Sequence, residues 1–398
     1  MDKSQFTSDA PGQLVRTTFL DRGKGVEGWA FVPNAPPSLA EVLERVGASG
    51  VGTLLDLQHR VSVAMGLLEG IFRQTPGGVN FNRWVLLRPL RLREARLSSQ
   101  IENTVASAKE VGLLDIEREG RSESLEVRNY MRAVDMAANT PGPMTETKIR
   151  ALHTELLRNV PRSEWKNPGR YRDAQVFIGD ESLGFEKARF VPPPPHEVPR
   201  LMTEFAAYLS NSSGTPPLLA AGIAHYQFET IHPFSDGNGR LGRMLITLSL
   251  CDGSSLTEPL IYPSGYIDRH KQAYYDSLRE VSLKGDWGGW LKYFLTAVLT
   301  EAEGTRLRAE RLLELRQRYV ALVGETAMQH RIISAIDFLF ERPVLVPSML
   351  RSSIGGTDQT ARNYCRNLED LGVLRKTYQV GKQHVYEAHE ILAIAQED

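Results

Sequence analysis

The segment His232-Pro-Phe-Ser-Asp-Gly-Asn-Gly-Arg-Leu-Gly-Arg243 carries more information than any other part of this chain. It combines a potential base (His232), a carboxylate (Asp236), a glycine-rich turn and two arginines. The residues from Arg240 onward (RLGRMLITLSL) predict a helix, so the turn would lie at a helix N-terminus. Free N–H groups and the helix dipole favour anions there. The segment therefore indicates a site for a phosphate-containing substrate.

The glycines and arginines of this segment each have a physical reason to contact an anion. Gly237-Asn238-Gly239 lets the backbone turn its N–H groups toward a ligand, because glycine has no Cβ to block the approach. Arg240 and Arg243 are three residues apart and share one helix face. Both guanidinium groups can therefore reach one polyphosphate. His225, seven residues before His232, is interpreted as a packing residue.

All nine specified positions of the pattern HPFxDGNGRxxR are present, and the chain resembles the Fic family. These enzymes mostly transfer a nucleotide monophosphate from ATP to a hydroxyl side chain of a target protein. The resemblance implies that His232 is the general base and that Asp236 binds Mg²⁺ on the nucleotide phosphates. It also implies that Gly237, Asn238, Gly239, Arg240 and Arg243 bind those phosphates. Relatives with Lys in place of Gly237 act as phosphotransferases, so Gly237 favours nucleotide transfer.

A second motif lies about 130 residues upstream. Ser98-Ser-Gln-Ile-Glu102-Asn103 fits the pattern [ST]xxxE[GN] and looks like the inhibitory motif of Fic proteins that carry their own brake. Ser98 and Glu102 are expected to share a helix face. The resemblance implies that the Glu102 carboxylate pairs with Arg243 and holds ATP in a non-productive pose.

The residues between these motifs contain two β-like runs, Gln175–Gly179 and Ala188–Val191, around a Gly/Asp-rich turn. This order predicts a hairpin over 175–191. It resembles the flap of Fic proteins, which aligns the target segment by adding it as a further β-strand. Ile178, Gly179 and Phe190 are the residues expected to contact the target.

Composition excludes several classes of protein. The 398 residues are 41% hydrophobic and 24% charged, with a net charge of −1, as in ordinary soluble proteins. This charge gives no general affinity for nucleic acid or membrane. Cys251 and Cys365 support neither a disulfide framework nor a metal site. No signal peptide and no spanning helix is expected, so the sequence predicts a cytoplasmic protein.

The predicted fold is mainly α-helical. Residues up to 35 are expected to form an extended arm, and Ser38 and Thr145 are expected to cap helices. The expected architecture is a helical Fic core with a β-hairpin flap, an N-terminal helical region and a C-terminal winged helix. The expected domains are 1–114 with the inhibitory motif, 115–300 as the catalytic core, 301–326 as a helical connector and 327–398 as a winged-helix-like domain.

The C-terminal region has the order of three helices followed by a small hairpin with Gly381 at its turn, which resembles a winged helix. Thr357 and Asp358 stand where a recognition helix would begin. Winged helices bind DNA and also proteins, so DNA contact, protein docking and dimerisation stay open. Six basic residues could line a phosphate-contacting face: Arg351, Arg362, Arg366, Arg375, Lys376 and Lys382.

The resulting hypothesis is an ATP- and Mg²⁺-dependent protein adenylyltransferase that modifies Tyr, Thr or Ser hydroxyls of a target protein, or of itself, and is inhibited by Glu102. Three alternatives stay open. The chain could remove AMP from a modified protein, use another donor such as UTP, GTP or CDP-choline, or act chiefly as a DNA-binding regulator through residues 327–398. A homodimer is plausible. The sequence does not identify the target.

Overall fold

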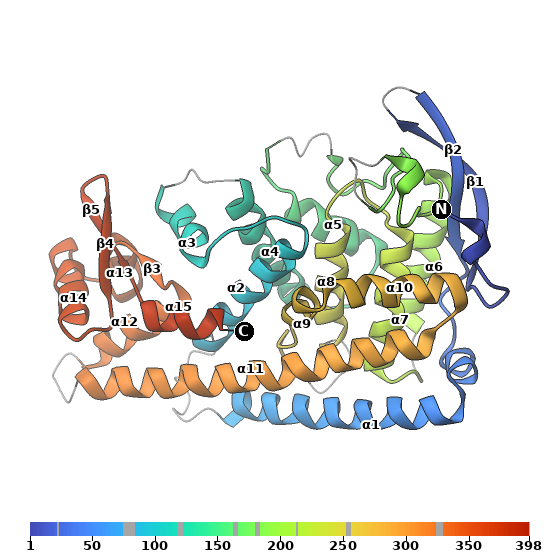
Figure 1. Cartoon of the computed structure of the whole chain (residues 1–398). Coiled ribbons are helices and arrows are strands. Elements are labelled where there is room, and N and C mark those ends of the chain that lie inside the picture. The colour runs from blue at the N-terminus through green and yellow to red at the C-terminus, as the bar shows by residue number, and fades with distance from the viewer. Residues whose placement is uncertain are drawn as a thin grey trace. The chain divides into compact units, whose positions relative to one another are not determined.

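A computed structural model describes the chain from residue 1 to 397 with eight gaps (Figure 1). The residues outside the description are 22–23, 75–83, 118–121, 162–165, 180–183, 212–213, 252–255, 324–328 and 398. The predicted break at Pro76-Gly-Gly78 and the tip of the predicted flap therefore lie outside the described residues. The chain divides into two compact units, one of residues 1–65 and 132–301 and the other of 66–131 and 302–398.

The chain is mainly helical, as the sequence predicts. Three helices contribute residues to both units: α1 (Leu39–Gln74), α4 (Ser122–Asn139) and α11 (Trp287–Val323). The other helices of the first unit are α5 (Glu146–Leu156), α6 (Val198–Asn211), α7 (Pro217–Ile231), α8 (Asn238–Ser249), α9 (Ser264–Arg269) and α10 (Lys271–Lys284). Its strands are β1 (Gly12–Asp21) and β2 (Lys24–Pro33), and its short 3-10 helices are η1 (Lys3–Gln5), η5 (Phe185–Lys187) and η6 (Pro195–Glu197).

Helix α7 is the centre of the first unit, because nearly all of its side chains are buried and it packs against α6, α8 and β2. Gly222 allows α11 to approach α7 closely, since a Cβ at this position would lie 2.9 Å from Leu291. The Nε1–H of Trp290 on α11 donates to the Gly222 carbonyl at 2.9 Å. This core fixes the C-terminal end of α7, where the signature segment begins.

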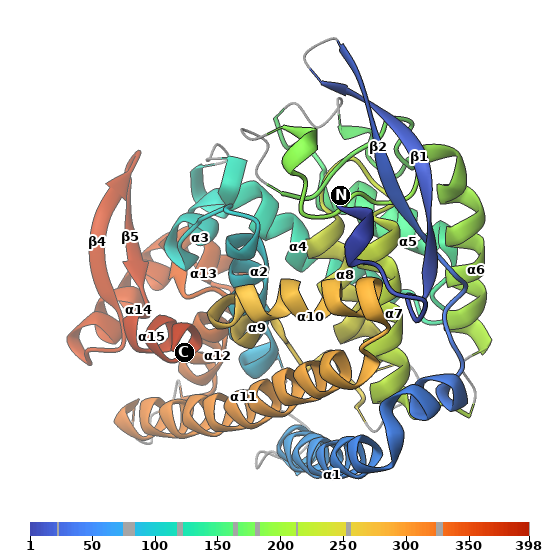
Figure 2. The ribbon, with the colours of Figure 1, turned by 45° about the vertical axis from the view of Figure 1, so that its right-hand side comes forward.

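The residues expected to form an extended arm form a long antiparallel hairpin instead. Strands β1 and β2 pair from Gly12↔Pro33 to Asp21↔Lys24. The prediction of an extended conformation is therefore confirmed for these strands. The pairing of the two strands was not predicted, because residues 1–35 show no regular alternation of apolar and polar residues. Figure 2 shows this hairpin beside the loops that carry η5.

Helix caps agree with the sequence. The Ser38 hydroxyl accepts from Glu41 N, and the Glu41 carboxylate accepts from Ser38 N, so the predicted capping box is present at the start of α1. The Thr145 hydroxyl accepts from Lys148 N and caps α5. The long helix expected from about 291 is α11, which begins four residues earlier at Trp287.

The second unit contains α2 (Trp84–Ile101), α3 (Ala108–Glu117), α12 (Gln329–Glu341), α13 (Pro347–Ile354), α14 (Asp358–Asp370) and α15 (His389–Gln396). Its strands β3 (Val344–Leu345), β4 (Arg375–Val380) and β5 (Gln383–Glu387) form one sheet in the order β3-β5-β4. The three predicted helices are α12, α13 and α14, and the predicted hairpin is β4–β5, with Gly381 at φ 58° in its turn. Strand β3 and helix α15 were not predicted.

None of the helices in the described part of the chain combines the length and the apolar character that a membrane span requires.

Candidate functional site

The signature segment begins with a backbone turn at the end of α7. His232 follows the last helical residue and has φ 49° and ψ 61°, the left-handed conformation. Its N–H still donates to the Phe228 carbonyl at 2.9 Å. A residue with a Cβ adopts this conformation at a cost of about 1–2 kcal/mol. The surrounding structure must therefore hold His232 in place.

The buried guanidinium of Arg172 holds this turn. Its Nε–H donates to the His232 carbonyl at 2.8 Å, and Nη2 donates to the Ile231 carbonyl at 3.4 Å. Nη2 also donates to the Pro193 carbonyl at 2.5 Å, and Nη1 to the Ala174 carbonyl at 3.3 Å. Burial lowers the pKa of Arg172 to about 10, so it stays charged at neutral pH. One cation thus joins the His232 turn to the segments on both sides of the predicted flap.

The next turn is closed by Asn238. Its Oδ1 accepts from Phe234 N at 2.9 Å, and its Nδ2 donates to Phe234 O at 2.8 Å. The Asn238 side chain therefore fastens the loop, a structural role in addition to the predicted contact with phosphate. The Phe234 ring is fully buried and stacks on His153 of α5, with centroids 3.8 Å apart and an angle of 9° between the planes.

His153 of α5 holds the signature loop, and both of its ring nitrogens form hydrogen bonds. Its Nδ1 accepts from Gly169 N at 2.8 Å, so Nε2 carries the proton and donates to the Asp236 carbonyl at 2.9 Å. Burial lowers the pKa of His153 to about 4. The imidazole is therefore neutral at neutral pH and keeps the tautomer that holds the loop.

Gly237 forms the N-terminus of α8. It has φ 79°, as expected for the glycine-rich turn, and a Cβ there would lie 3.3 Å from Leu156 and 3.6 Å from His153 Nε2. The first N–H groups of a helix have no acceptor within it. The backbone at Gly237 and Gly239 thus occupies the position that anion binding requires, although Gly237 N donates to Asp236 Oδ1 at 2.7 Å in this structure.

Asp236 lies between two cations. Its Oδ2 is 2.6 Å from Lys166 Nζ, and its Oδ1 is 3.5 Å from Arg240 Nη2. Burial opposes ionisation, but the charges of Arg240 and Lys166 outweigh it and hold the pKa of Asp236 below the usual value. Asp236 is therefore an anion at neutral pH.

Arg240 and Arg243 lie on the buried face of α8, with 2% and 1% of their surface exposed. The charge of Arg243 acts on His225 of α7, whose pKa falls to about 3, chiefly through burial. The neutral His225 shares a hydrogen bond of 2.7 Å with the Tyr274 hydroxyl and has the position of a packing residue. The two arginines thus lie in the first two turns of α8, close to the helix N-terminus.

The predicted flap is less regular than a two-stranded hairpin. Between residues 175–179 and 184–191, which the structure describes, the arms share one antiparallel bridge. In it, Ile178 N donates to Phe190 O at 2.8 Å and Phe190 N donates to Ile178 O at 3.1 Å. Gly179 is exposed, with φ 151°. Neither described arm forms a regular strand, and η5 lies between the two arms.

The flap rests on the N-terminal hairpin. The Phe19 ring stacks on Phe185 of η5, with centroids 5.1 Å apart, and Phe31 N donates to Val191 O at 2.9 Å. The apolar cluster between them contains Ala30, Phe185 and Val191, with Met1, Val15, Phe19, Val26, Phe177 and Ala188 against it. The outer edge of the 189–191 arm is thus used by β2, which leaves the 177–179 arm as the edge for a further strand.

The inhibitory motif forms the C-terminal end of α2. The helix ends at Ile101, and Glu102 lies in the turn that follows. The expectation that Ser98 and Glu102 share a helix face is therefore wrong: Ser98 is fully buried, whereas Glu102 is exposed. Asn103 has φ 62°, and Thr104 N donates to Ser99 O while Asn103 N donates to Gln100 O.

This pair of bonds is a Schellman motif, with Asn103 in the left-handed position that Gly or Asn favours. This explains why the pattern has Gly or Asn at that position: the residue ends α2 directly after Glu102. Glu102 belongs to the second unit and Arg243 to the first, so their pairing stays a prediction.

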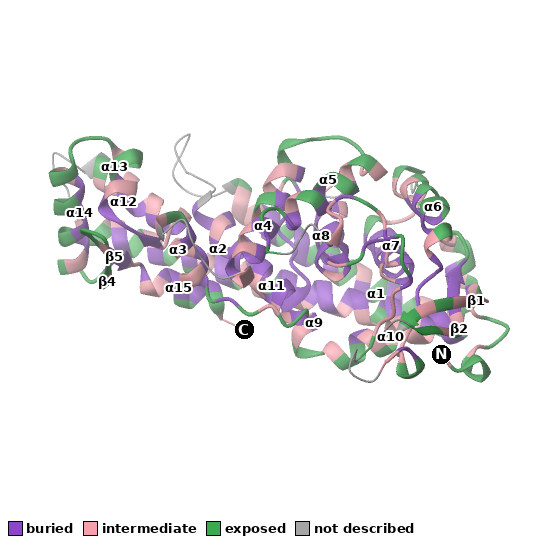
Figure 3. Cartoon of the chain, turned by 90° about the horizontal axis from the view of Figure 1, so that it is seen from above, coloured by how far each residue is buried: buried purple, intermediate pink, exposed green. Residues whose placement is uncertain are grey.

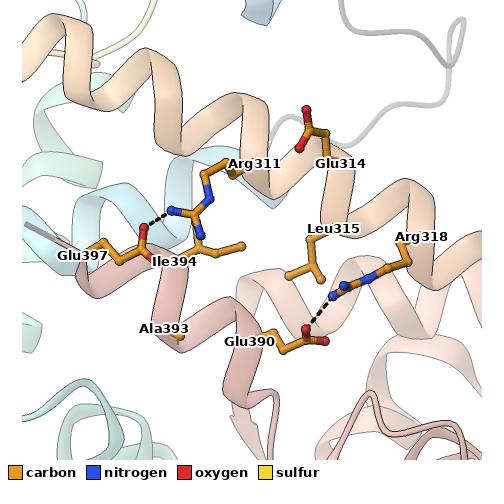
Figure 4. Close-up of a pocket in the computed structure, with 8 residues that line it drawn as sticks. All are labelled: Arg311, Glu314, Leu315, Arg318, Glu390, Ala393, Ile394 and Glu397. Atoms are coloured by element: carbon orange, nitrogen blue, oxygen red, sulfur yellow. Dashed lines mark hydrogen bonds and ion pairs between the residues drawn. The ribbon is translucent and has the colours of Figure 1, made fainter.

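A separate groove of about 410 Å³ lies between α11 and α15 (Figure 4). Arg311 pairs with Glu397 across it, and Arg318 Nη2 lies 2.5 Å from Glu390 Oε1. These pairs fasten α15 to α11, and the groove is interpreted as structural.

Comparison with known proteins identifies the domains around this loop. Residues 143–250 match the Fic/DOC family, and residues 55–139 match the N-terminal domain of that family. The chain contains both of these Fic/DOC domains. The signature segment lies near the end of the Fic domain, and the inhibitory motif lies within its N-terminal partner.

Curated relatives of this Fic-domain chain are named protein adenylyltransferases. A probable protein adenylyltransferase of Aquifex aeolicus (strain VF5) is 29% identical over 187 residues, and the protein adenylyltransferase Fic of Aedes aegypti is 29% identical over 195 residues. These alignments cover 45% and 46% of this chain. They span 54% and 35% of the two relatives, so the chain matches about half or less of their length.

Two solved structures have the same fold. A Fic family protein from Desulfovibrio desulfuricans G20 has a TM-score of 0.54 at 23% identity, covering 84% of this chain and 95% of that one. Fic-1 from C. elegans (residues 134–508) has a TM-score of 0.50 at 19% identity, covering 67% and 75%. The helical Fic fold predicted from the sequence is confirmed.

Three residues of the site were not predicted. Arg172 could have been suspected from Gly169-Arg-Tyr-Arg172 next to the flap, and His153 from its place on the buried face of α5 with Ile149, Leu152 and Leu156. Lys166 has no signal in the sequence. Each acts through a contact with residues distant in sequence, which periodicity cannot show.

Proposed function

We propose that this chain is an ATP-dependent protein adenylyltransferase. The observation that carries the proposal is the turn from α7 to α8, which presents His232 in a constrained left-handed conformation beside a helix N-terminus backed by Arg240 and Arg243. The names of the relatives support AMP as the transferred group.

In the proposed reaction, an imidazole nitrogen of His232 accepts the proton of a target hydroxyl. The hydroxyl oxygen attacks the α-phosphorus of ATP, and the bond from that phosphorus to the oxygen leading to the β-phosphate breaks. Pyrophosphate leaves with the electron pair. The products are AMP joined to the protein and diphosphate. General base catalysis of this kind contributes about 10²–10⁴ in rate.

The α8 N-terminus and its arginines would bind the phosphates. Gly237 and Gly239 supply backbone N–H groups, Asn238 fixes their orientation by closing the loop, and Arg240 and Arg243 supply the positive charge. Because the leaving group carries most of the negative charge, Arg243 would act on the γ-phosphate end.

Asp236 fits the role of a magnesium ligand, because it is a partly exposed carboxylate held in its ionised form. Within the described residues no cluster of three metal-ligating side chains occurs, so Asp236 would be the main protein ligand. Mg²⁺ commonly binds through one or two carboxylates together with phosphate oxygens and water. The ion would neutralise charge on the nucleotide phosphates. Lys166 would have to give up its ion pair with Asp236 when the ion binds.

The target would add as a strand to the flap arm at Ile178 and Gly179, because β2 already uses the edge of the other arm. Phe190 pairs with Ile178 and fixes the register of that arm. Addition of a strand suits any target that presents its Tyr, Thr or Ser on an extended segment. The enzyme's own segments are included among such targets.

We further propose that Glu102 is a brake on Arg243. Its support is the match to the pattern [ST]xxxE[GN] and the Schellman turn at Asn103, which ends α2 directly after Glu102. The proposal includes two further expectations. Residues 115–300 form the catalytic core, and the protein is cytoplasmic.

The test of this function is transfer of AMP itself. Wild-type protein incubated with ATP, Mg²⁺ and a cell extract should yield a protein whose intact mass has grown by one AMP. Parallel incubations with UTP, GTP and CDP-choline identify the donor. Loss of AMP from a pre-modified target, without any gain from ATP, would replace the proposal by AMP removal, with Glu102 aligning the attacking water.

We expect Arg172→Lys to lower kcat for transfer by about 10²-fold, because a displacement of about 1 Å at the reacting groups costs that much. Lysine keeps the charge but cannot reach four carbonyls at once. The KM for ATP should change little, because Arg172 contacts the His232 turn and not the α8 N-terminus. Steady-state kinetics with Arg170→Lys, an exposed neighbour, as the control would check this. Equal losses in both variants would contradict the positioning role.

A further inference from the structure

The outer face of α14 is polar along its length and belongs to no part of the site above. Gln359, Arg362, Asn363 and Arg366 are all exposed and follow the i, i+3, i+4, i+7 spacing of one helix face. The inner face, with Ala361, Tyr364, Cys365 and Leu368, is buried in the core of the second unit. Figure 3 shows the outer turns of α14 as exposed.

These exposed side chains are held together on the surface. Gln359 Nε2 donates to Asn363 Oδ1 at 2.9 Å, and Arg362 Nη2 donates to Gln359 Oε1 at 3.4 Å. The group lies in the first half of α14, directly after the Thr357 cap, whose hydroxyl accepts from Thr360 N. The side chains of Gln359, Arg362 and Asn363 are thus joined by hydrogen bonds, which fixes the positions of their donor and acceptor groups on the helix surface.

The neighbouring elements give this face a flank of positive charge. Arg375, Lys376 and Lys382 are exposed on β4 and at the β4–β5 turn. The amide of Gln383, just after that turn, accepts from Ser348 N at 3.2 Å and so fastens the hairpin to the start of α13. Helix α13 also packs against α14, so it links the hairpin to that helix.

The acidic residues of this region do not interrupt the first half of α14. Asp358 is paired with Arg351 at 2.9 Å, and Glu387 with Lys109 at 2.5 Å. Glu369 and Asp370 lie in the last turn of α14. The side that remains, at the N-terminal half of the helix, is neutral or positive.

The chemistry of the face favours a nucleic acid over a protein. Protein interfaces have a buried centre of aromatic and apolar side chains. The exposed residues of α14 named above include none of these. Arginine instead makes bidentate contacts to guanine, and asparagine or glutamine to adenine, in the major groove. The helix is about 20 Å long at about 1.5 Å per residue, and a helix of this kind fits that groove.

We propose that α14 enters the major groove of duplex DNA, with Gln359, Arg362 and Asn363 at the base edges, and that the β4–β5 hairpin contacts the phosphates through Lys376 and Lys382. The proposal rests on the polar outer face of α14 and on the exposed basic residues of the hairpin. This proposal is independent of nucleotide transfer.

The experiment is a titration of a fluorescein-labelled duplex of mixed sequence with the full chain, followed by fluorescence anisotropy at several salt concentrations. Non-specific binding is expected in the range of about 10⁻⁴–10⁻⁶ M, weakening as salt rises. Arg362→Ala should weaken binding about tenfold or more, and Lys382→Ala should lower the salt slope by about one. Arg331→Ala, an exposed arginine on α12, is the matched control and should bind like wild type.

Two results would overturn the proposal. One is the absence of salt-dependent duplex binding by the wild-type chain at low salt. The other is an equal effect of Arg362→Ala and Arg331→Ala. If duplex binding is absent and sedimentation shows a dimer that Arg362→Ala dissociates, the face is an interface between two copies of the chain. AMP transfer by Arg362→Ala should equal that of the wild type in every case.

Discussion

The His232→Asn variant is expected to lose AMP transfer by a factor of about 10²–10⁴, the contribution of a general base. Asparagine is the informative substitution, because residue 232 has φ 49° and asparagine tolerates the left-handed conformation better than alanine does. The backbone turn, the bond from Arg172 to the residue 232 carbonyl and the path into α8 should therefore survive. Loss of activity would then reflect the missing base and not a collapsed loop.

The measurement is the initial rate of AMP incorporation from ATP into the best target from the extract. His196→Asn, which changes an exposed histidine on η6, should keep the wild-type rate. Thermal unfolding of both variants should match that of the wild type within a few degrees. An active His232→Asn protein would remove His232 from the role of base, whatever its fold.

The second large effect is expected from Glu102→Gly, which should raise the transfer rate by about 10- to 150-fold. The estimate takes the lost interaction as one charge-assisted hydrogen-bonded pair with Arg243, worth about 1.5–3 kcal/mol. Glu102 is the first residue after α2, so glycine there leaves the helix and its Schellman turn in place. The variant should fold as the wild type does.

Glu102→Gln serves as the matched comparison, because the amide keeps the size of the side chain but removes its charge. It should also activate transfer, whereas Glu102→Asp should keep most of the inhibition. Rates are measured over a range of ATP concentrations, so that a change in kcat can be separated from a change in KM. If Glu102→Gly transfers no faster than the wild type, Glu102 is not a brake. If the same variant loses the ability to remove AMP, the carboxylate acts in hydrolysis of the AMP-protein bond.

The local structure of the site could be predicted from the sequence because it depends on residues close together in the chain. The positive φ of Gly237 and the start of α8 follow from the glycine-rich turn and the helical pattern after it. The caps at Ser38, Thr145 and Thr357 follow from side chains that reach N–H groups three residues away.

The predictions that went wrong depended on where a helix ends or which strands pair. The helical pattern around Ser98 continues past Ile101, yet Asn103 stops the helix by taking a left-handed conformation, which places Glu102 outside it. The flap has β-like residues in both arms, but β2 takes one edge, and among the described residues of the flap only Ile178 and Phe190 form a bridge.

The sequence by itself determined the Fic signature, the mainly helical fold and the chemical types at the candidate site. These are properties of short segments: residue identity, helical periodicity and turn chemistry. The tertiary structure alone decided what holds the site in place. Arg172 binds carbonyls on both sides of the flap, and His153 supports Phe234 and Asp236 from a helix about 80 residues away. A buried polar group must find its partners in space, and their distance along the chain places no constraint on that choice.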